Sequence, residues 1–411
     1  MAIAPELTAA LDADMPAVVA TYKDFHATPE LSMQEHETAQ KIRARLDELG
    51  YETFASGGTG VVGVLRNGDG PTIAYRADTD GLPIAEDTGL PFASQATGTL
   101  PDGSEAPVMH GCGHDTHITV GLETAVLLAG HRDTWSGTIV FLFQPGEETG
   151  AGAKAMVDDG VWDRAPHPEA VYGQHVWPAQ AGTVSTSSGT AMAMADSYEV
   201  VVRGRQAHGS QPEASIDPIV LGAFMITRLQ TVVSREVGAR EMVVLTIGRF
   251  NGGLKENIIP AEARFTINTR TFDPAVRAHV EEVIGRIVRA EAQASGAPEP
   301  EIRKLYDFPE CYNDPELTAD FFDVVRAELG AEQAVEVPPA TGSEDFGRFG
   351  QAVGAPAVYW FFGSQTPQAL AAENVPSNHS PHFAPTDIET TLRTGVRAAL
   401  AVLTSRLRAA R

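Results

Sequence analysis

The stretch TIVFLFQPGEETG, residues 138–150, joins an apolar run to two adjacent glutamates. Its first six residues are all apolar or β-branched, which is typical of a strand covered on both faces. Four other runs share this character, at residues 61–65, 72–78, 170–177 and 356–363. Helical patterns such as residues 117–131 separate several of these runs, as crossover helices between parallel strands do. The sequence therefore predicts an α/β fold with a mainly parallel sheet.

Residues 190–306 have a different pattern, which predicts a second and smaller domain. Strand-like and helix-like segments follow one another there in the order β-α-β-β-α-β, which is that of a small ferredoxin-like α+β sheet. The long helical segments of this domain are expected at residues 215–236 and 274–295. We therefore expect this domain to be inserted into a larger catalytic domain, which is made of residues 1–189 and 307–411.

The amino-acid composition and net charge favour a globular enzyme over a nucleic-acid-binding or membrane protein. The chain has 411 residues, of which 43% are hydrophobic and 20% charged, as in an ordinary globular enzyme. Its 54 acidic and 30 basic side chains give a net charge of −24, which disfavours binding to nucleic acid or to an anionic membrane surface. The sequence contains neither a signal-peptide pattern nor an uncharged run long enough to span a membrane, so we expect a soluble, cytoplasmic protein.

The two cysteines have different environments. Cys311 follows a predicted strand and is interpreted as a small buried residue. Cys112 lies in MHGCGHDTH, residues 109–117, among glycines, histidines and an aspartate. A disulfide between these two unrelated segments is not expected in a reducing compartment. Cys112 is therefore a candidate metal ligand or catalytic thiol.

Potential metal ligands lie at the ends of predicted strands, where a parallel sheet binds ligands, in a glycine-flanked loop before a predicted helix, and before a Ser-Pro turn. They are Cys112, His114, Glu148, His175 and, near the C-terminus, His379. Thiolate, imidazole and carboxylate groups suit zinc or a similar divalent ion. Five ligands exceed the four of one tetrahedral zinc site, so two ions about 3.5–4 Å apart with a bridging water are expected.

Glu147 precedes the expected ligand Glu148 and is placed to accept a proton from that water. A storage or structural metal site would not need such a base. Asp80, His110, Asp115 and His117 are interpreted as residues that orient the ligands.

Ten motifs, which extend along nearly the whole chain, resemble those of the metal-dependent amidohydrolases. This family includes hippurate hydrolases, bacterial aminoacylases and plant indole-acetyl-amino-acid hydrolases, and its members are relatives of carboxypeptidase G. The motifs, in order, are HATPELSMQEHETAQKI, YRADTDGLP, MHGCGHDTH, QPGEETGAGAKAMVDDG, GQHVWP, AHGSQP, ENIIP, NTR, TGSEDF and NHSPHF. YRAD replaces the His-x-Asp pattern of the carboxypeptidase relatives, so the resemblance implies the metal ligand set that contains Cys112.

The resemblance also implies roles for the inserted domain, which in this family is a lid and a dimerisation module. His208 would contact the reacting carbonyl group, in its own subunit or across a homodimer. Asn257 and Arg270 would hold the polar end of the substrate, since a guanidinium matches a carboxylate. Alternatively, Arg270 only pairs with an acid within the sheet.

The expected activity is hydrolysis of the amide bond of N-acyl amino acids, with two ions of zinc, manganese or cobalt. A dipeptidase or carboxypeptidase activity at the same site stays open, as does the identity of the acyl group. We also consider a thiol hydrolase, with Cys112 as nucleophile and His114 as base, and a non-catalytic metal- or ligand-binding protein. Both of these would leave Glu147 without a role.

Overall fold

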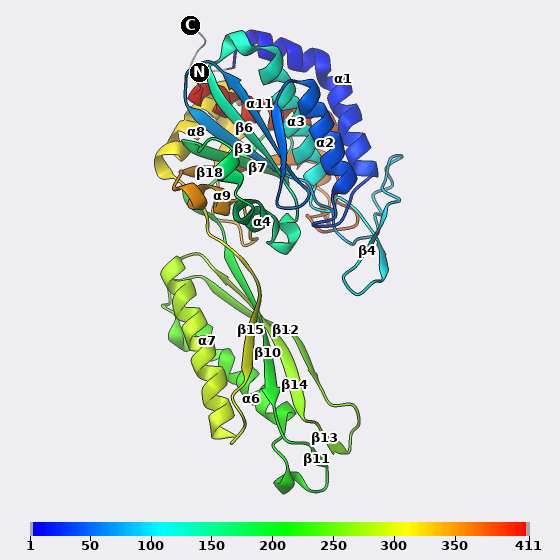
Figure 1. The fold of residues 1–411 in the computed structure, drawn as a ribbon, viewed down its shortest axis with the longest axis vertical. Helices are drawn as coiled ribbons and strands as arrows, with labels where there is room; N and C mark the ends of the chain where they lie inside the picture. Colours follow the sequence, from blue (N-terminus) through cyan, green and yellow to red (C-terminus); the bar gives the residue numbers. More distant parts are fainter. Residues whose placement is uncertain (1–2, 408–411) are drawn as a thin grey trace. The chain divides into compact units, whose positions relative to one another are not determined.

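The structure is a computed structural model that describes residues 3–407 (Figure 1). It divides into two compact units. Unit 1 consists of Met1–Ala191, Cys311–Pro339 and Asp345–Arg411, and unit 2 of Met192–Glu310 and Ala340–Glu344. The sequence pattern gives no sign of the short segment Ala340–Glu344 in unit 2.

Unit 1 is built on an eight-stranded sheet with the order β1-β2-β6-β3-β7-β18-β8-β17. The strands β6, β3, β7 and β18 are parallel neighbours, whereas β1 and β2 add antiparallel pairs at one edge. This arrangement confirms the predicted α/β class with a mainly parallel sheet. The strands are β1 (Glu52–Ser56), β2 (Gly60–Asn67), β3 (Thr72–Asp78), β6 (Gly137–Gln144), β7 (Ala170–Gln180), β8 (Val184–Thr186), β17 (Ala334–Glu336) and β18 (Ala357–Gln365).

Helices cover this sheet and enclose one apolar core. The helices of unit 1 are α1 (Pro5–Ala27), α2 (His36–Glu48), α3 (His114–Gly130), α4 (Gly152–Asp158), α5 (Val161–Arg164), α8 (Pro315–Leu329), α9 (Gly347–Val353), α10 (Pro367–Leu370) and α11 (Ile388–Arg406). Its short strand pairs are β4 (Thr97–Thr99) with β5 (Glu105–Pro107), and β9 (Gly189–Met192) with β16 (Cys311–Asn313). Within residues 3–407, the structure contains no helix that is long and apolar enough to cross a membrane.

Unit 2 has a four-stranded antiparallel sheet with the order β12-β14-β10-β15 and its own apolar core. Two helices, α6 (Pro218–Leu229) and α7 (Pro274–Ala294), pack against each other. Its strands are β10 (Met194–Arg203), β11 (Ala207–His208), β12 (Val243–Gly252), β13 (Ile258–Ile259), β14 (Glu262–Thr271) and β15 (Glu301–Phe308).

Three helices begin at an Asp-Pro pair, which fixes their first turns. Asp217, Asp273 and Asp314 each accept hydrogen bonds from two backbone N–H groups of α6, α7 and α8, respectively. The proline that follows has a backbone angle suited to the first helical position and has no N–H group to satisfy.

Candidate metal centre

Three parallel strands bring polar side chains to one edge of the sheet in unit 1. Asp78 ends β3, Glu147 and Glu148 follow β6, and His175 lies in the second half of β7. Strands that run in the same direction end at the same edge, which is where open α/β sheets bind ligands.

Two glycines allow the neighbouring loops to turn tightly. Gly113 has φ 82°, and a Cβ atom there would lie 2.4 Å from a methyl carbon of Val176. Gly146 has φ 57°, and its Cβ would lie 2.5 Å from the sulfur of Met33. Any other residue would therefore be strained and would clash at either position.

The two histidines of this edge each bind a fixed acceptor through Nδ1. His114 Nδ1 lies 3.2 Å from Asp80 Oδ1, and His175 Nδ1 lies 2.6 Å from the carbonyl oxygen of Val176. Because these acceptors require an N–H donor at Nδ1, Nε2 is the nitrogen of each ring that can bind a metal. His114 Nε2 is buried and has no hydrogen-bond partner among the described residues. His175 Nε2 lies 3.3 Å from Cys112 Sγ.

His379 approaches the same cluster from the C-terminal part of unit 1. Its Nε2 lies 3.3 Å from Glu148 Oε2, and its backbone has the unusual φ of 69°. Its backbone N–H donates to Gly111 O at 2.8 Å, and the neighbouring Asn378 Nδ2 donates to Cys112 O at 3.0 Å. These two bonds attach the His379 loop to the loop that carries Cys112.

The five predicted ligands thus form one cluster. Donor atoms of Cys112, Glu148 and His379 all lie within 4.8 Å of one another, as do those of His114, Glu147 and Glu148.

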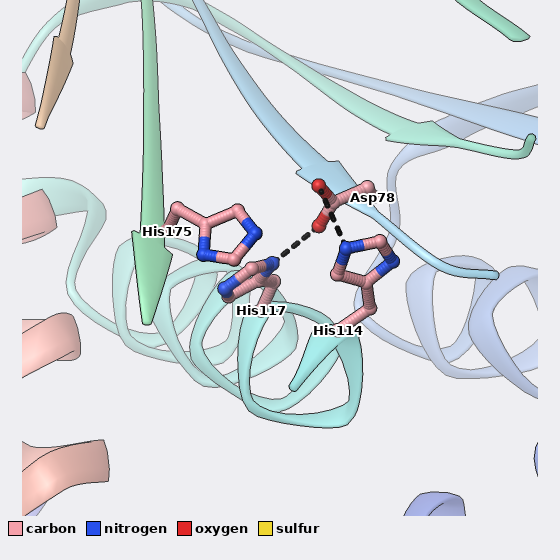
Figure 2. Close-up of side chains that lie close together, drawn as sticks. All are labelled: Asp78, His114, His117 and His175. Carbon is pink, nitrogen blue, oxygen red and sulfur yellow. Dashed lines mark hydrogen bonds and ion pairs between the residues drawn. The ribbon is translucent and has the colours of Figure 1, made fainter. Parts of the chain in front are cut away.

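Figure 2 shows a second group around Asp78, which sequence reasoning did not include among the ligands. Asp78 Oδ1 accepts a hydrogen bond from His117 Nδ1, and Asp78 Oδ2 lies 3.6 Å from His114 Nε2. His117 Nε2 accepts the N–H of Val176 at 2.7 Å. Both ring nitrogens of His117 are therefore in use, so it positions Asp78 and is not a metal ligand.

A buried arginine stabilises the charge of Asp78. Arg76 Nη1 donates to Asp78 Oδ2 at 2.7 Å, and both side chains are fully buried. Burial opposes ionisation of Asp78, but Arg76, followed by His114 and His117, holds its pKa well below the usual range. The signal in the sequence was an arginine in the middle of an apolar strand, at YRAD.

Asp80 connects the ligands to the loop that carries Glu147. It accepts hydrogen bonds from His114 Nδ1, from the backbone N–H groups of Glu147 and Glu148 at 3.2 and 3.1 Å, and from Ser32 Oγ at 2.6 Å. Its side chain is buried. Asp80 therefore has the position expected of a residue that orients a metal ligand.

Glu35 supports the same loop from the N-terminal part of the chain. It is fully buried and accepts the backbone N–H of Gly146 at 2.8 Å, that of Met33 at 2.8 Å, and the hydroxyl of Thr59. Burial, and then the charge of Asp80, raise the pKa of Glu35 to about 7. Sequence analysis assigned no role to Glu35, because its partners Thr59 and Gly146 are distant from it in the chain.

Two of the residues expected to orient ligands have other environments. Asp115 Oδ2 lies 2.6 Å from His26 Nδ1, and Glu86 lies 2.9 Å from the other ring nitrogen of His26. Although burial opposes the charge, these carboxylates raise the pKa of His26 to about 10. His110 is buried, and its ring nitrogens have no hydrogen-bond partner in the described part of the chain. Asp115 thus links α3 to α1 through His26 instead of orienting a predicted ligand.

The electrostatics of the cluster fit divalent cations. Burial, and then the charges of Glu148, Glu147 and Asp78, hold the pKa of the Cys112 thiol well above its usual value. A buried Glu148 oxygen, Oε1, has no hydrogen-bond partner within residues 3–407, like His114 Nε2. Bound cations would satisfy these atoms and favour the Cys112 thiolate, and the set of sulfur, nitrogen and oxygen donors suits zinc-like metals.

The three predicted site residues of unit 2, His208, Asn257 and Arg270, lie at two separate places in this unit. His208 is exposed in β11, with its Nδ1 2.7 Å from Ser210 Oγ. Asn257 is exposed beside it, since the N–H of Gly209 donates to Asn257 O at 2.8 Å. His208 pairs with Ile258 of β13, which follows Asn257 and ends three positions before β14 begins.

Arg270 lies near the other end of β14 and is half-buried. Its Nε donates to Asn268 Oδ1 at 3.2 Å, and its Nη1 donates to the hydroxyl of Ser343. Burial lowers the pKa of Arg270, and these two partners are neutral. The side chain is therefore available to pair with an anion.

Residues 74–401 match the model of peptidase family M20/M25/M40. The chain belongs to this family. It is 39% identical to a hippurate hydrolase of Campylobacter jejuni over 79% of this chain and 82% of that protein. It is also 33% identical to thermostable carboxypeptidase 1 of Saccharolobus solfataricus, over 89% of this chain and 90% of that protein.

A solved structure has the same fold over nearly the whole chain. The YxeP protein of Bacillus subtilis, described as a dinuclear metal binding peptidase from the M20 family, has a TM-score of 0.76 and 32% sequence identity. The match covers 95% of this chain and 98% of that protein. The chain is thus a metal-dependent amidohydrolase of the M20 family, as the resemblance predicts.

Proposed function

We propose that this member of the M20 family hydrolyses the amide bond of N-acyl amino acids and releases a carboxylic acid and a free amino acid. The observation that carries the proposal is the cluster of Cys112, His114, Glu148, His175 and His379 beside Glu147. The similarity to a hippurate hydrolase supports a substrate with an acyl group on an amino acid.

In this proposal the five ligands hold two divalent ions, which are zinc, manganese or cobalt. Such ions lower the pKa of a water molecule and polarise a carbonyl group. Glu147 accepts the proton of the attacking water and then delivers it to the leaving nitrogen. Asp80 positions Glu147 for this transfer, because it holds the backbone N–H groups of both Glu147 and Glu148.

The substrate needs further donors, which we assign to unit 2. His208 stabilises the oxyanion, and Asn257 and Arg270 bind the polar end of the substrate. Arg270 lies eight residues beyond Glu262 in β14, a distance of about 27 Å along a strand. One small substrate cannot bridge that distance, which supports a site that combines Arg270 of one chain with His208 and Asn257 of a second chain.

An unpaired sheet edge supports the proposed homodimer. β12 is an edge strand of the four-stranded sheet, and Val244 on it is 48% exposed. Phe224 and Val220 on α6 are 60% and 51% exposed. An apolar edge strand next to apolar helix positions suits pairing with a second copy of the same surface. Neither Cys112 nor Cys311 forms a disulfide within residues 3–407, which is compatible with the proposed cytoplasmic location.

The similarity to a carboxypeptidase supports a second candidate function, cleavage of a peptide next to a C-terminal residue. Both functions need a free carboxylate on the substrate and therefore share Arg270. A thiol mechanism is disfavoured, because burial of Cys112, and then the carboxylates around it, oppose formation of a thiolate in the absence of cations.

A substrate panel with metal-stripped and reloaded enzyme tests the proposal. N-acetyl, N-benzoyl, long-chain and indolyl-acetyl amino acids would be compared with dipeptides by kcat/KM, with zinc, manganese or cobalt added. We expect stripped enzyme to be inactive, each effective metal to restore activity, and N-acyl amino acids to exceed dipeptides. Full activity after complete chelation would refute the metal mechanism, and a preference for dipeptides would favour the peptidase.

A further inference from the structure

Unit 1 contains a pocket of about 460 Å³ between α1, α2 and α3, away from the metal cluster. Its walls are mostly apolar and include Val18, Phe25, Leu122 and Val126. A volume of this size is typical of sites for small molecules.

Two acids line this pocket, Asp24 and Glu123, and the side chain of Glu123 is unsatisfied. Glu123 is only 8% exposed, and its Oε1 is buried with no hydrogen-bond partner among the described residues. A buried carboxyl oxygen without a partner costs free energy, so it is rarely retained unless a ligand or water satisfies it.

The basic side chains of the pocket already have acidic partners. Lys41 Nζ lies 2.8 Å from Asp24 Oδ2, and Arg45 Nη1 lies 3.2 Å from Glu48 Oε2. No such ion pair is formed by Glu123 in the described residues. Ionised Glu123 would therefore need a positive charge from a ligand.

We propose that this pocket binds a small apolar molecule that carries an ammonium group, with the Glu123 carboxylate as its counter-ion. The apolar walls cover the body of the ligand, and the Glu123 carboxylate accepts a hydrogen bond from the ammonium. Glu123 lies nine residues along α3 from His114, which is about 13 Å in a helix. The site is thus distinct from the metal cluster and is independent of the proposed function.

The environment of Glu123 makes the affinity for a cationic ligand depend on pH. Burial, and then Asp14 on α1, raise the pKa of Glu123 to about 8, whereas Arg45 on α2 lowers it. Asp24 and Lys41 also line the pocket and pair with each other. Free Glu123 is therefore mostly protonated at neutral pH, and a bound cation makes it release this proton.

Isothermal titration calorimetry of the metal-loaded enzyme with benzylamine tests the proposal. We expect millimolar or tighter binding that strengthens roughly tenfold per pH unit between about pH 6 and 7.5, with release of a proton. Glu123→Gln should weaken binding by at least about tenfold and remove this pH dependence. Asp133→Asn, which removes an exposed charge just beyond α3, should bind like the wild type.

A second variant keeps the test informative if Glu123→Gln does not fold. Thr21→Phe leaves the carboxyl in place but fills the pocket from α1, and it should abolish binding. The proposal is overturned if benzylamine does not bind at about 10 mM, if neither variant changes its affinity, or if benzyl alcohol binds as tightly as benzylamine.

Discussion

Replacement of Asp80 by asparagine tests how the metal ligands and the general base are held. The carboxylate accepts four hydrogen bonds, from Ser32, His114 and the backbone of Glu147 and Glu148. Asparagine has the same shape but offers one acceptor oxygen, and its NH₂ group would face donors. About two of the four bonds should therefore be lost.

The magnitude follows from the character of these bonds. A hydrogen bond to a buried charged group is worth about 1.5–3 kcal/mol, so Asp80→Asn should lower the unfolding free energy of the metal-free protein by roughly 3–6 kcal/mol. Loss of the bond to His114 should also reduce metal affinity by about 10–100-fold. Urea unfolding of the stripped protein measures the first quantity, and competition with a chelator measures the second.

Asp102→Asn is a suitable control. Asp102 also accepts a serine hydroxyl and a backbone N–H, but it lies in the exposed loop between β4 and β5. This variant should leave stability and metal affinity unchanged. If Asp80→Asn binds metal and unfolds like the wild type, then Asp80 does not organise the site and our reasoning is refuted.

Three further predictions address the base, the partner chain and the buried acid. Glu147→Gln should lower kcat by about 10²–10⁴-fold with metal content unchanged, and loss of metal would instead make Glu147 a ligand. His208→Ala should lower kcat by about 10²–10³-fold, and mixing it with Glu147→Ala chains should restore activity. Lack of recovery despite proven subunit exchange would contradict a shared site. Burial raises the pKa of Glu123 from 4.5 to about 8. Between these two pH values the folded chain binds more protons than the unfolded chain, so the free energy of unfolding falls as the pH rises. Glu123→Gln should remove this loss, about 3 kcal/mol near pH 7, and equal stability of the two proteins at pH 5 and pH 8 by urea unfolding would refute it.

The sheet of unit 1 could be predicted because its central strands are buried on both faces. The apolar runs at 72–78 and 170–177 correspond to β3 and β7 within a few residues. Residues 31–50 have the apolar spacing of an amphipathic helix and end at a glycine, but α2 begins only at His36. The start of this helix depends on tertiary contacts, because the Glu35 side chain points inward and accepts hydrogen bonds from the backbone of Met33 and Gly146. A local sequence pattern does not reveal such contacts.

Glu148 and His175 could be predicted because their chemistry stands out from the apolar strand residues before them, whereas Cys112, His114 and His379 could be predicted because they lie among other polar residues and glycine or proline. The residues that hold them were harder to assign. Asp78, Arg76 and His117 form one buried group. His117 was expected to orient a ligand, but the sequence does not show that Asp78 is its partner. A histidine that binds a metal differs from one that positions another residue in the hydrogen-bond partners of its ring nitrogens. These partners come from distant parts of the chain, as Val176 does for His117.

The position of β18 between β7 and β8 has a consequence for synthesis of the chain. β7 ends at Gln180, whereas β18 ends at Gln365, about 185 residues later. At roughly 5–20 residues per second, the ribosome needs about 10–40 s to produce the strand that covers this edge. During that time unit 2 can be completed, because it lies almost entirely between the two strands. The growing chain meanwhile exposes the apolar edge of β7, which makes nascent or truncated chains of this enzyme targets for chaperones and prone to aggregate.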